Sequence, residues 1–164
     1  PYPVTSIRVS PYYQRLATSS PPGAVLDIPF TVDGWLAQNM RYQVSHGRPI
    51  AGGYISIHPS EPYQAIKQDA LLSKLYGFAP RLDAPPAASD FRDRGFGVVI
   101  LHKNKVAPTD IVASRGTIRR SDYEDLRSAL ERGLGLATYE DLDLLAFEIS
   151  DAKTIVPAPP KQAH

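Results

Sequence analysis

The sequence contains no cysteine among its 164 residues. A disulfide framework and any zinc or thiol chemistry based on cysteine are therefore excluded. It also lacks an apolar run of the ~20 residues that a membrane-spanning helix requires, and its first residues do not have the pattern of a signal peptide. Because the chain opens on Pro1-Tyr2-Pro3 without an initiator methionine, we expect it to be a fragment of a longer polypeptide.

Signatures of phosphate, metal and nucleophile chemistry are also missing. The chain has no G-x-G-x-x-G, no G-x-x-x-x-G-K-[ST] and no G-x-S-x-G. No two of its four histidines have the short spacing of zinc ligands; they are His46, His58, His102 and His164. The formal net charge of +1 gives no general reason to expect a nucleic acid partner. The sequence therefore predicts neither a cofactor nor a metal, and no nucleic acid.

The composition is that of one globular domain with proline-rich ends. Hydrophobic residues make up 43% and charged residues 21% of the chain, which is typical of a folded domain. The 16 prolines gather near the start, at Pro85-Pro86, and near the end, and such clusters favour extended segments. We expect an extended lead-in over 1–22, a single α/β domain over 23–150 and a flexible tail over 151–164.

Short apolar runs predict the strands. These runs are residues 25–29, which lie between Gly and Pro signals, 49–57 and 96–101. The last run is rich in β-branched residues, as in a central strand covered on both faces. Residues 138–140 and 144–149 predict a hairpin around 141–143.

Between these strands, the sequence predicts helices. Leu36, Met40 and Val44 recur every four residues, which places them on one face of a helix that ends near Gly47. Residues 60–76 predict a second helix, 89–94 a short one, and 103–120 a polar loop. Ser121 and Glu124 match a capping box, which predicts a last helix that buries Leu126, Ala129 and Leu130. The alternation predicts a three-layer Rossmann-like α/β sandwich, mostly parallel, with a C-terminal antiparallel hairpin.

Asp27 is the most interesting carboxylate, because it lies inside an apolar strand near its carboxyl end. Ligands of open α/β sheets favour that edge, so Asp27 could be a base or a ligand anchor. The commoner role of such a carboxylate is to cap a neighbouring loop or helix N-terminus by accepting backbone N–H bonds.

The basic residues Arg115, Arg119 and Arg120 could contact anionic lipid headgroups or form a solvated loop. Five tyrosines could stack on sugars or lie at the domain boundary with buried rings and exposed hydroxyls; they are Tyr12, Tyr13, Tyr42, Tyr54 and Tyr63.

Several phrases resemble one known family. They are Val25-Leu26-Asp27-Ile28-Pro29, the stretch from Met40 to Ser56 that includes Tyr42-Gln43, His46-Gly47 and Gly52-Gly53-Tyr54, and the stretch from Arg94 to Lys103. Over roughly residues 11–150 the chain resembles the C-terminal soluble region of bacterial polytopic proteins of the GT-C glycosyltransferase type, which are related to lipid-phosphate-sugar-dependent mannosyltransferases.

The resemblance implies a non-catalytic domain on the extracytoplasmic face of the cell membrane, since the catalytic acid of that family lies in a membrane part that this sequence does not contain. It implies that the membrane-embedded portion of the same polypeptide is a partner, together with a glycan or lipid-linked sugar. The possible binding surface comprises Asp27, Tyr42, Gln43, His46, Gly52, Gly53, Tyr54 and His102. A glycine-rich strand start that the fold itself needs would explain the same phrase. Two alternatives stay open: a small ligand-binding module or enzyme with a cleft near Asp27 and His46, and a structural subunit of a membrane-associated complex.

Overall fold

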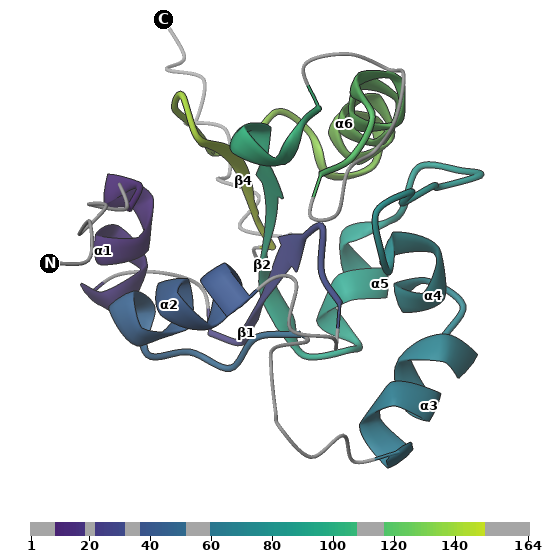
Figure 1. Ribbon diagram of the computed structural model, residues 1–164, viewed down its shortest axis with the longest axis horizontal. Helices are drawn as coiled ribbons and strands as arrows, with labels where there is room; N and C mark the ends of the chain where they lie inside the picture. Colours follow the sequence, from purple (N-terminus) through teal and green to yellow (C-terminus); the bar gives the residue numbers. More distant parts are fainter. Residues whose placement is uncertain (1–8, 19–21, 32–36, 52–59, 108–116, 150–164) are drawn as a thin grey trace, which may run out of the picture.

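The structure is a computed structural model that describes residues 9–18, 22–31, 37–51, 60–107 and 117–149. It is an α/β fold with one mixed four-stranded sheet in the order β1-β2-β4-β3 (Figure 1). The strands are β1 (Ala24–Ile28), β2 (Phe96–His102), β3 (Tyr139–Glu140) and β4 (Leu144–Glu148). The helices are α1 (Pro11–Thr18), α2 (Ala37–His46), α3 (Ser60–Gln68), α4 (Leu72–Leu75), α5 (Ala88–Arg92), the 3-10 turn η2 (Lys103–Lys105) and α6 (Arg120–Leu134).

The pairing of the strands confirms part of the predicted sheet. β1 and β2 run parallel, with Asp27 opposite Ile100, and β3 and β4 form the predicted antiparallel hairpin. β4 also pairs antiparallel with β2, so one of the three pairings between the described strands is parallel and the expected parallel majority is not seen among them. Ile50 makes a parallel bridge to Val25, whereas residues 52–57 of the predicted second strand lie outside the described residues.

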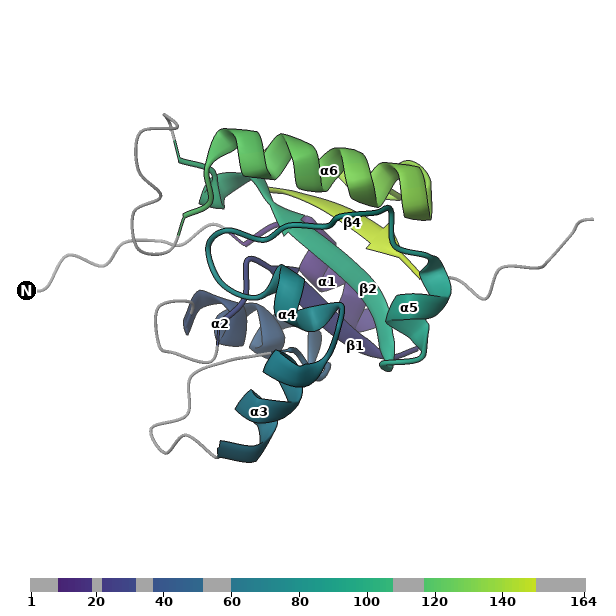
Figure 2. The same ribbon diagram turned by 90° about the vertical axis from the view of Figure 1, so that its right-hand side faces the viewer.

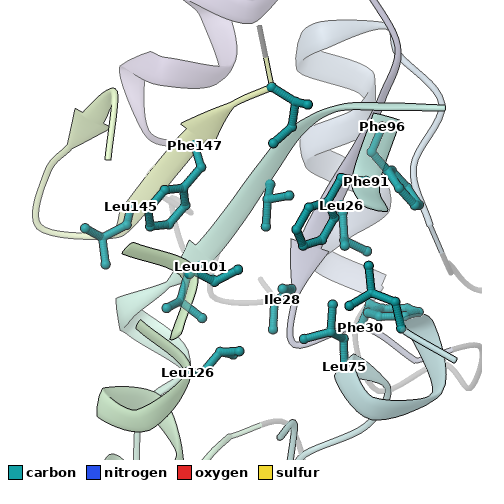
Figure 3. Packing of buried hydrophobic residues seen from close by; sticks show 14 of the residues in the cluster. Leu26, Ile28, Phe30, Leu75, Phe91, Phe96, Leu101, Leu126, Leu145 and Phe147 are labelled. Carbon is teal, nitrogen blue, oxygen red and sulfur yellow. The ribbon is translucent and has the colours of Figure 1, made fainter. Parts of the chain in front are cut away.

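Side chains alternate between the two faces of the sheet, as the period of a strand requires. On one face, Leu26, Leu101 and Phe147 pack with α4, α5 and α6 in the larger hydrophobic cluster (Figure 3). On the other face, Val25 and Ile100 pack in a smaller cluster with α1 and α2. Figure 1 shows α1 and α2 on one side of the strands and α4, α5 and α6 on the other. All seven residues of β2 are buried, as the prediction of a central strand requires.

The extended lead-in predicted over 1–22 is wrong at residues 11–18, which form helix α1. Pro11 is the first helical residue, a position where its missing N–H costs nothing, so a proline here begins a helix rather than preventing one. Tyr12, Tyr13 and Leu16 then fall on the buried side. The remaining predicted ends, 1–8 and 151–164, lie outside the described residues.

The prediction that α2 buries an apolar face is wrong for Met40 and Val44, the two predicted residues whose exposure the structure describes. Met40 is 36% and Val44 87% exposed, and the side chain of Leu36 lies outside the described residues. The buried side chains of this helix are instead Asn39, Tyr42 and His46. α2 therefore turns its polar and aromatic side toward the sheet, because that side meets buried polar partners.

The helix predicted over 60–76 is two helices, because Asp69 interrupts it. The carboxylate of Asp69 accepts hydrogen bonds from the backbone N–H groups of Leu71 and Leu72 at 2.9 and 2.8 Å, which holds the turn before α4, whose N-cap residue is Leu71. The same carboxylate also binds Arg94, which connects this turn to the end of α5. Ala70 lies in the turn between the two helices and is exposed.

Helix α6 begins one residue before the predicted capping box. Arg119 is its N-cap residue without a side-chain cap, and its guanidinium pairs with Asp122 at 2.8 Å. The predicted burial of Leu126, Ala129 and Leu130 is confirmed, and Gly135, with φ of 87°, ends the helix. Gly133 lies directly against the chain at Pro86, where a Cβ atom would stand 2.0 Å from the Pro86 carbonyl oxygen.

The predicted loop over 103–120 contains regular structure at both ends. Residues 103–105 form η2, and Val106 makes a parallel bridge to Ile118, while 108–116 lie outside the described residues. Of the helices in the described ranges, none has both the length and the apolar character that crossing a membrane requires.

The packing of the larger cluster predicts the effect of deleting one of its rings. Phe147 is 1% exposed at the centre of the sheet, so Phe147→Ala should lower the free energy of unfolding by about 3–5 kcal/mol. Leu142→Ala is the matched control, since Leu142 is 77% exposed and its loss should change stability by less than about 0.5 kcal/mol. Urea unfolding followed by circular dichroism measures both, and equal effects would contradict the assignment of the core.

Candidate functional site

The parallel pairing of β1 and β2 places two ionisable side chains at the same edge of the sheet. Asp27 lies opposite Ile100, and His102 follows two residues later on the same face of β2. Both face α1 and α2. The exposed fraction is 0% for Asp27 and 1% for His102. The edge that the sequence analysis singled out for Asp27 is therefore also where His102 lies, but both side chains are sealed from solvent.

The carboxylate of Asp27 is held by two donors. The phenol of Tyr13 donates to Oδ1 at 2.6 Å, and Nε2 of His102 lies 2.8 Å from the same oxygen. These lengths are those of charge-assisted hydrogen bonds to a carboxylate. Tyr13 is also within 3.2 Å of His102 Nε2, so the three groups form a closed triangle. An unpaired carboxylate buried at this depth would be costly by several kcal/mol, and these two partners offset that penalty.

Two rings from α2 complete the group, which we call the Asp27 cluster: Tyr13, Asp27, Tyr42, His46 and His102. The ring of Tyr42 stacks on Tyr13 at 4.5 Å between centroids and on His102 at 5.2 Å. His46 stacks on Tyr13 at 5.7 Å. The cluster thus joins α1, α2, β1 and β2 through rings and one carboxylate.

Three polar atoms of the cluster are buried without a hydrogen-bond partner in the part of the chain that the structure describes: Asp27 Oδ2, His46 Nε2 and His102 Nδ1. The backbone N–H of Arg48 donates to Nδ1 of His46 at 3.1 Å, so in neutral His46 the proton sits on Nε2. Neutral His102 carries its proton on Nε2, facing Asp27, which leaves Nδ1 as an acceptor. The unpartnered set is therefore one donor and two acceptors.

Burial governs how the rings of the cluster ionise. Loss of solvent, followed by the charge of Asp27, raises the pKa of Tyr13 well above its ordinary value. Burial likewise raises the pKa of Tyr42, although a hydrogen bond from Asn104 works against the rise. Burial lowers the pKa of His46, with Asp27 opposing and Arg48 adding to that shift. Both tyrosines are therefore neutral donors at physiological pH, and His46 favours its neutral form.

The structure brings together four of the eight residues predicted for the binding surface: Asp27, Tyr42, His46 and His102. Gln43 lies on α2 beside them but is only half-buried, and its carbonyl accepts the N–H of Gly47, the residue that follows α2. Gly52, Gly53 and Tyr54 lie outside the described residues. Tyr13 was considered only as one of several tyrosines that could stack on sugars and was not predicted for the binding surface, although Pro11 followed by Tyr12, Tyr13 and Leu16 indicates a helix with a buried side.

The arrangement limits the chemistry available. Among the described residues, no three His, Asp or Glu side chains are placed to hold a metal ion together. A general base must reach the proton it removes, whereas Asp27 has no exposed surface and uses one oxygen to hold Tyr13 and His102. The cluster as it stands can fix side chains in place and can accept a hydroxyl or a water only if one is buried with it.

Comparisons with protein-family models, with curated proteins and with solved structures found no match to this chain.

The closed triangle predicts a specific loss on removing the Tyr13 hydroxyl. Tyr13→Phe keeps the ring but takes one of two donors from a buried carboxylate, so we expect the free energy of unfolding to fall by about 2–3 kcal/mol. Tyr12→Phe is the neighbouring control, because its hydroxyl donates at 3.2 Å to the half-buried Glu148, and its removal should have an effect of about 1 kcal/mol or less. Urea titration compares the two variants; an equal or larger effect of Tyr12→Phe would contradict the role of Tyr13.

The lowered pKa of His46 predicts that stability falls as the pH falls. The unfolded chain takes up the proton near pH 6.5, while the folded protein takes it up only at lower pH, so protons favour unfolding in that interval. The contribution of neutral His46 to the free energy of unfolding is complete above pH 6.5, and it is lost as the pH falls below that value toward the lowered pKa of the folded protein. His46→Gln removes the titrating group and should flatten the stability profile between about pH 7.5 and 5.5.

Four acidic side chains with shifted pKa values titrate below this pH interval and do not contribute to the slope within it. Asp69, Asp83, Glu140 and Asp141 have pKa values below their ordinary 3.8 to 4.5, so they titrate at lower pH. His102→Gln is a second variant that separates the two histidines. A profile unchanged by His46→Gln would show that His46 is not the group responsible.

Proposed function

We propose that this chain is a non-catalytic extracytoplasmic domain of a larger membrane protein related to GT-C glycosyltransferases. In that protein it would contact the membrane-embedded portion of the same polypeptide and assist the binding of a glycan or lipid-linked sugar acceptor. The proposal rests on the resemblance of the phrases around Asp27, Tyr42, His46 and His102, and on what the geometry makes of these residues.

The single observation that carries the proposal is the sealed Asp27 carboxylate. Residues separated by up to 89 positions, Tyr13 and His102, converge on one oxygen with no exposed surface. A reaction centre requires substrate access, whereas a joint that fixes two helices to a sheet requires the burial seen here. The characteristic phrases are therefore best explained as the internal joint of a supporting domain.

We extend the proposal to the finer description of the fold as a Rossmann-like three-layer sandwich with a mostly parallel sheet. Helices against both faces of the sheet support it, as does the parallel bridge between Val25 and Ile50 on the free side of β1. The two antiparallel pairings of β4 correspond to the antiparallel finish of such a sheet.

The test uses the full-length protein. We expect its reading frame to encode hydrophobic spans before Pro1. The purified full-length protein is then assayed with a polyprenyl-phosphate sugar donor. Asp27→Asn and His102→Gln should reduce the amount of folded protein while turnover per folded molecule stays within about twofold. A general acid or base contributes ~10²–10⁴-fold to rate, so a loss of that size per folded molecule would contradict a non-catalytic domain, as would a gene without hydrophobic spans.

A second candidate, a small ligand-binding module or enzyme at the Asp27 cluster, is favoured by one observation. Asp27 Oδ2, His46 Nε2 and His102 Nδ1 have no partner among the described residues, and a hydroxyl group could accept from His46 Nε2 and donate to one of the two acceptors. Calorimetry of this chain with monosaccharides and nucleotides tests it. Saturable binding that Asp27→Asn abolishes would support this candidate, while binding unaffected by that substitution would exclude the cluster as the site.

A further inference from the structure

We propose that the cleft between α6 and residues 103–106 is a binding site for a phosphate group. This Tyr123 cleft has a volume of about 270 Å³ and is lined by Lys103, Val106, Arg120, Tyr123, Glu124 and Arg127. Figure 2 shows helix α6, which forms one wall of the cleft. The cleft lies on the α6 side of the sheet, opposite the face that carries the Asp27 cluster. It is therefore independent of the function proposed above.

The spacing of α6 creates one wall of the cleft. Residues 120, 123, 124 and 127 lie on one face of a helix, because they are separated by three, four and seven positions. That wall carries two guanidinium groups, and Lys103 supplies the third cation from η2. The volume of about 270 Å³ is slightly smaller than that of ordinary ligand pockets, which start near ~300 Å³, so the cleft suits a compact group rather than a whole cofactor.

Lys103 and Arg127 are held in place by carboxylates, and each still has N–H donors that make no hydrogen bond to those carboxylates. Lys103 Nζ donates to Glu140 at 2.5 Å and to the Asp141 carbonyl at 2.6 Å, so one of its three N–H donors remains. Arg127 donates through Nε to Glu131 at 2.9 Å, and its NH2 group lies 3.7 Å from Glu140. Since an arginine has five donors, the terminal nitrogens of Arg127 can still bind an oxygen of a ligand.

Within the described ranges, Arg120 and Tyr123 are donors that lack an acceptor. Arg120 is exposed and makes no hydrogen bond or ion pair within the described residues. The Tyr123 side chain is 4% exposed, and its hydroxyl is buried without a partner in the same part of the chain. A buried polar atom without a partner is uncommon in folded proteins, and here it belongs to a residue that lines the cleft.

The tyrosine hydroxyl remains protonated at physiological pH. Burial is the main cause that raises the pKa of Tyr123 to about 12; the charges of Glu124, Glu131 and Glu140 add to the rise and Arg127 opposes it. Tyr123 therefore offers a proton to an acceptor. A phosphate group has oxygens on all sides and can accept from Tyr123, Arg120 and Arg127 together, which a planar carboxylate cannot do equally well.

The acids around the cleft limit how strongly it attracts anions. Glu124 lines it, and Glu131 and Glu140 pair with its cations, so the three cations face three carboxylates. Attraction must therefore come from directed donors rather than from net charge. We expect weak, saturable binding that selects phosphate over chloride.

The experiment is an NMR titration of this chain with inorganic phosphate at constant ionic strength, with chloride as the competing ion. Saturable shifts should appear at Arg120, Tyr123 and Arg127. Arg120→Gln should weaken binding about tenfold, which is the size expected for one hydrogen bond to a charged group, and Tyr123→Phe should weaken it severalfold. Arg132→Gln is the control, an exposed arginine on the same helix, and should leave binding unchanged.

Two further arms distinguish the source of the phosphate group. Glucose 1-phosphate tests a free sugar phosphate, and co-sedimentation with phosphatidylcholine vesicles with and without phosphatidylglycerol tests a lipid headgroup. Binding in either arm that Arg120→Gln weakens supports the proposal and names the source. Unsaturable shifts spread over all surface cations, or equal effects of Arg120→Gln and Arg132→Gln, would overturn it. Neither result depends on the Asp27 cluster, so the outcome is separate from that of the proposed function.

Discussion

The burial of the Asp27 carboxylate is the constraint on which the sheet edge and two of its helices depend. A charged group with no exposed surface must find donors inside the protein, and it finds them in Tyr13 and His102. Tyr13 can reach it only if α1 lies on that face of the sheet, and His102 only if β2 pairs with β1 in the observed register. One polar side chain in an apolar strand thereby fixes the position of α1 and the register of two strands.

Apolar patterning predicted the parts of the fold in which hydrophobic burial decides the structure. The run from Phe96 to Leu101 and the hairpin strand at 144–149 were predicted as strands, and strands are observed over Phe96–His102 and Leu144–Glu148, because their side chains are buried on both faces of the sheet. The same reasoning failed at α2. Met40 and Val44 have helical spacing but face outward, since the inner side of α2 must supply Tyr42 and His46 to a polar neighbour. A pattern of hydrophobic residues does not show that a strand carries a carboxylate in need of partners.

The candidate site was predictable in part for the same reason. Asp27 was recognised as a candidate because it is a carboxylate inside an apolar strand, whereas His46 and His102 were included because they belong to the phrases that resemble the GT-C family. Parallel pairing brings Asp27 and His102 to one edge. Tyr13 was left out of the predicted binding surface because its neighbouring prolines indicated an extended segment. The Tyr123 cleft combines residues of η2 and α6, and the sequence alone did not show how these two elements meet. The two faces of the sheet thus carry different polar features: a closed one beneath α1 and α2, and an open one beside α6.

The contact between Gly133 and Pro86 has a consequence for how this domain can vary. Two backbones touch there with no side chain between them, so neither segment can be changed without the other. An insertion or deletion between α4 and α5 would shift Pro86 and lift the end of α6 from the sheet. In relatives of this chain, a larger residue at position 133 should therefore occur together with a different length of that connection, and grafting either segment alone into another background should fail.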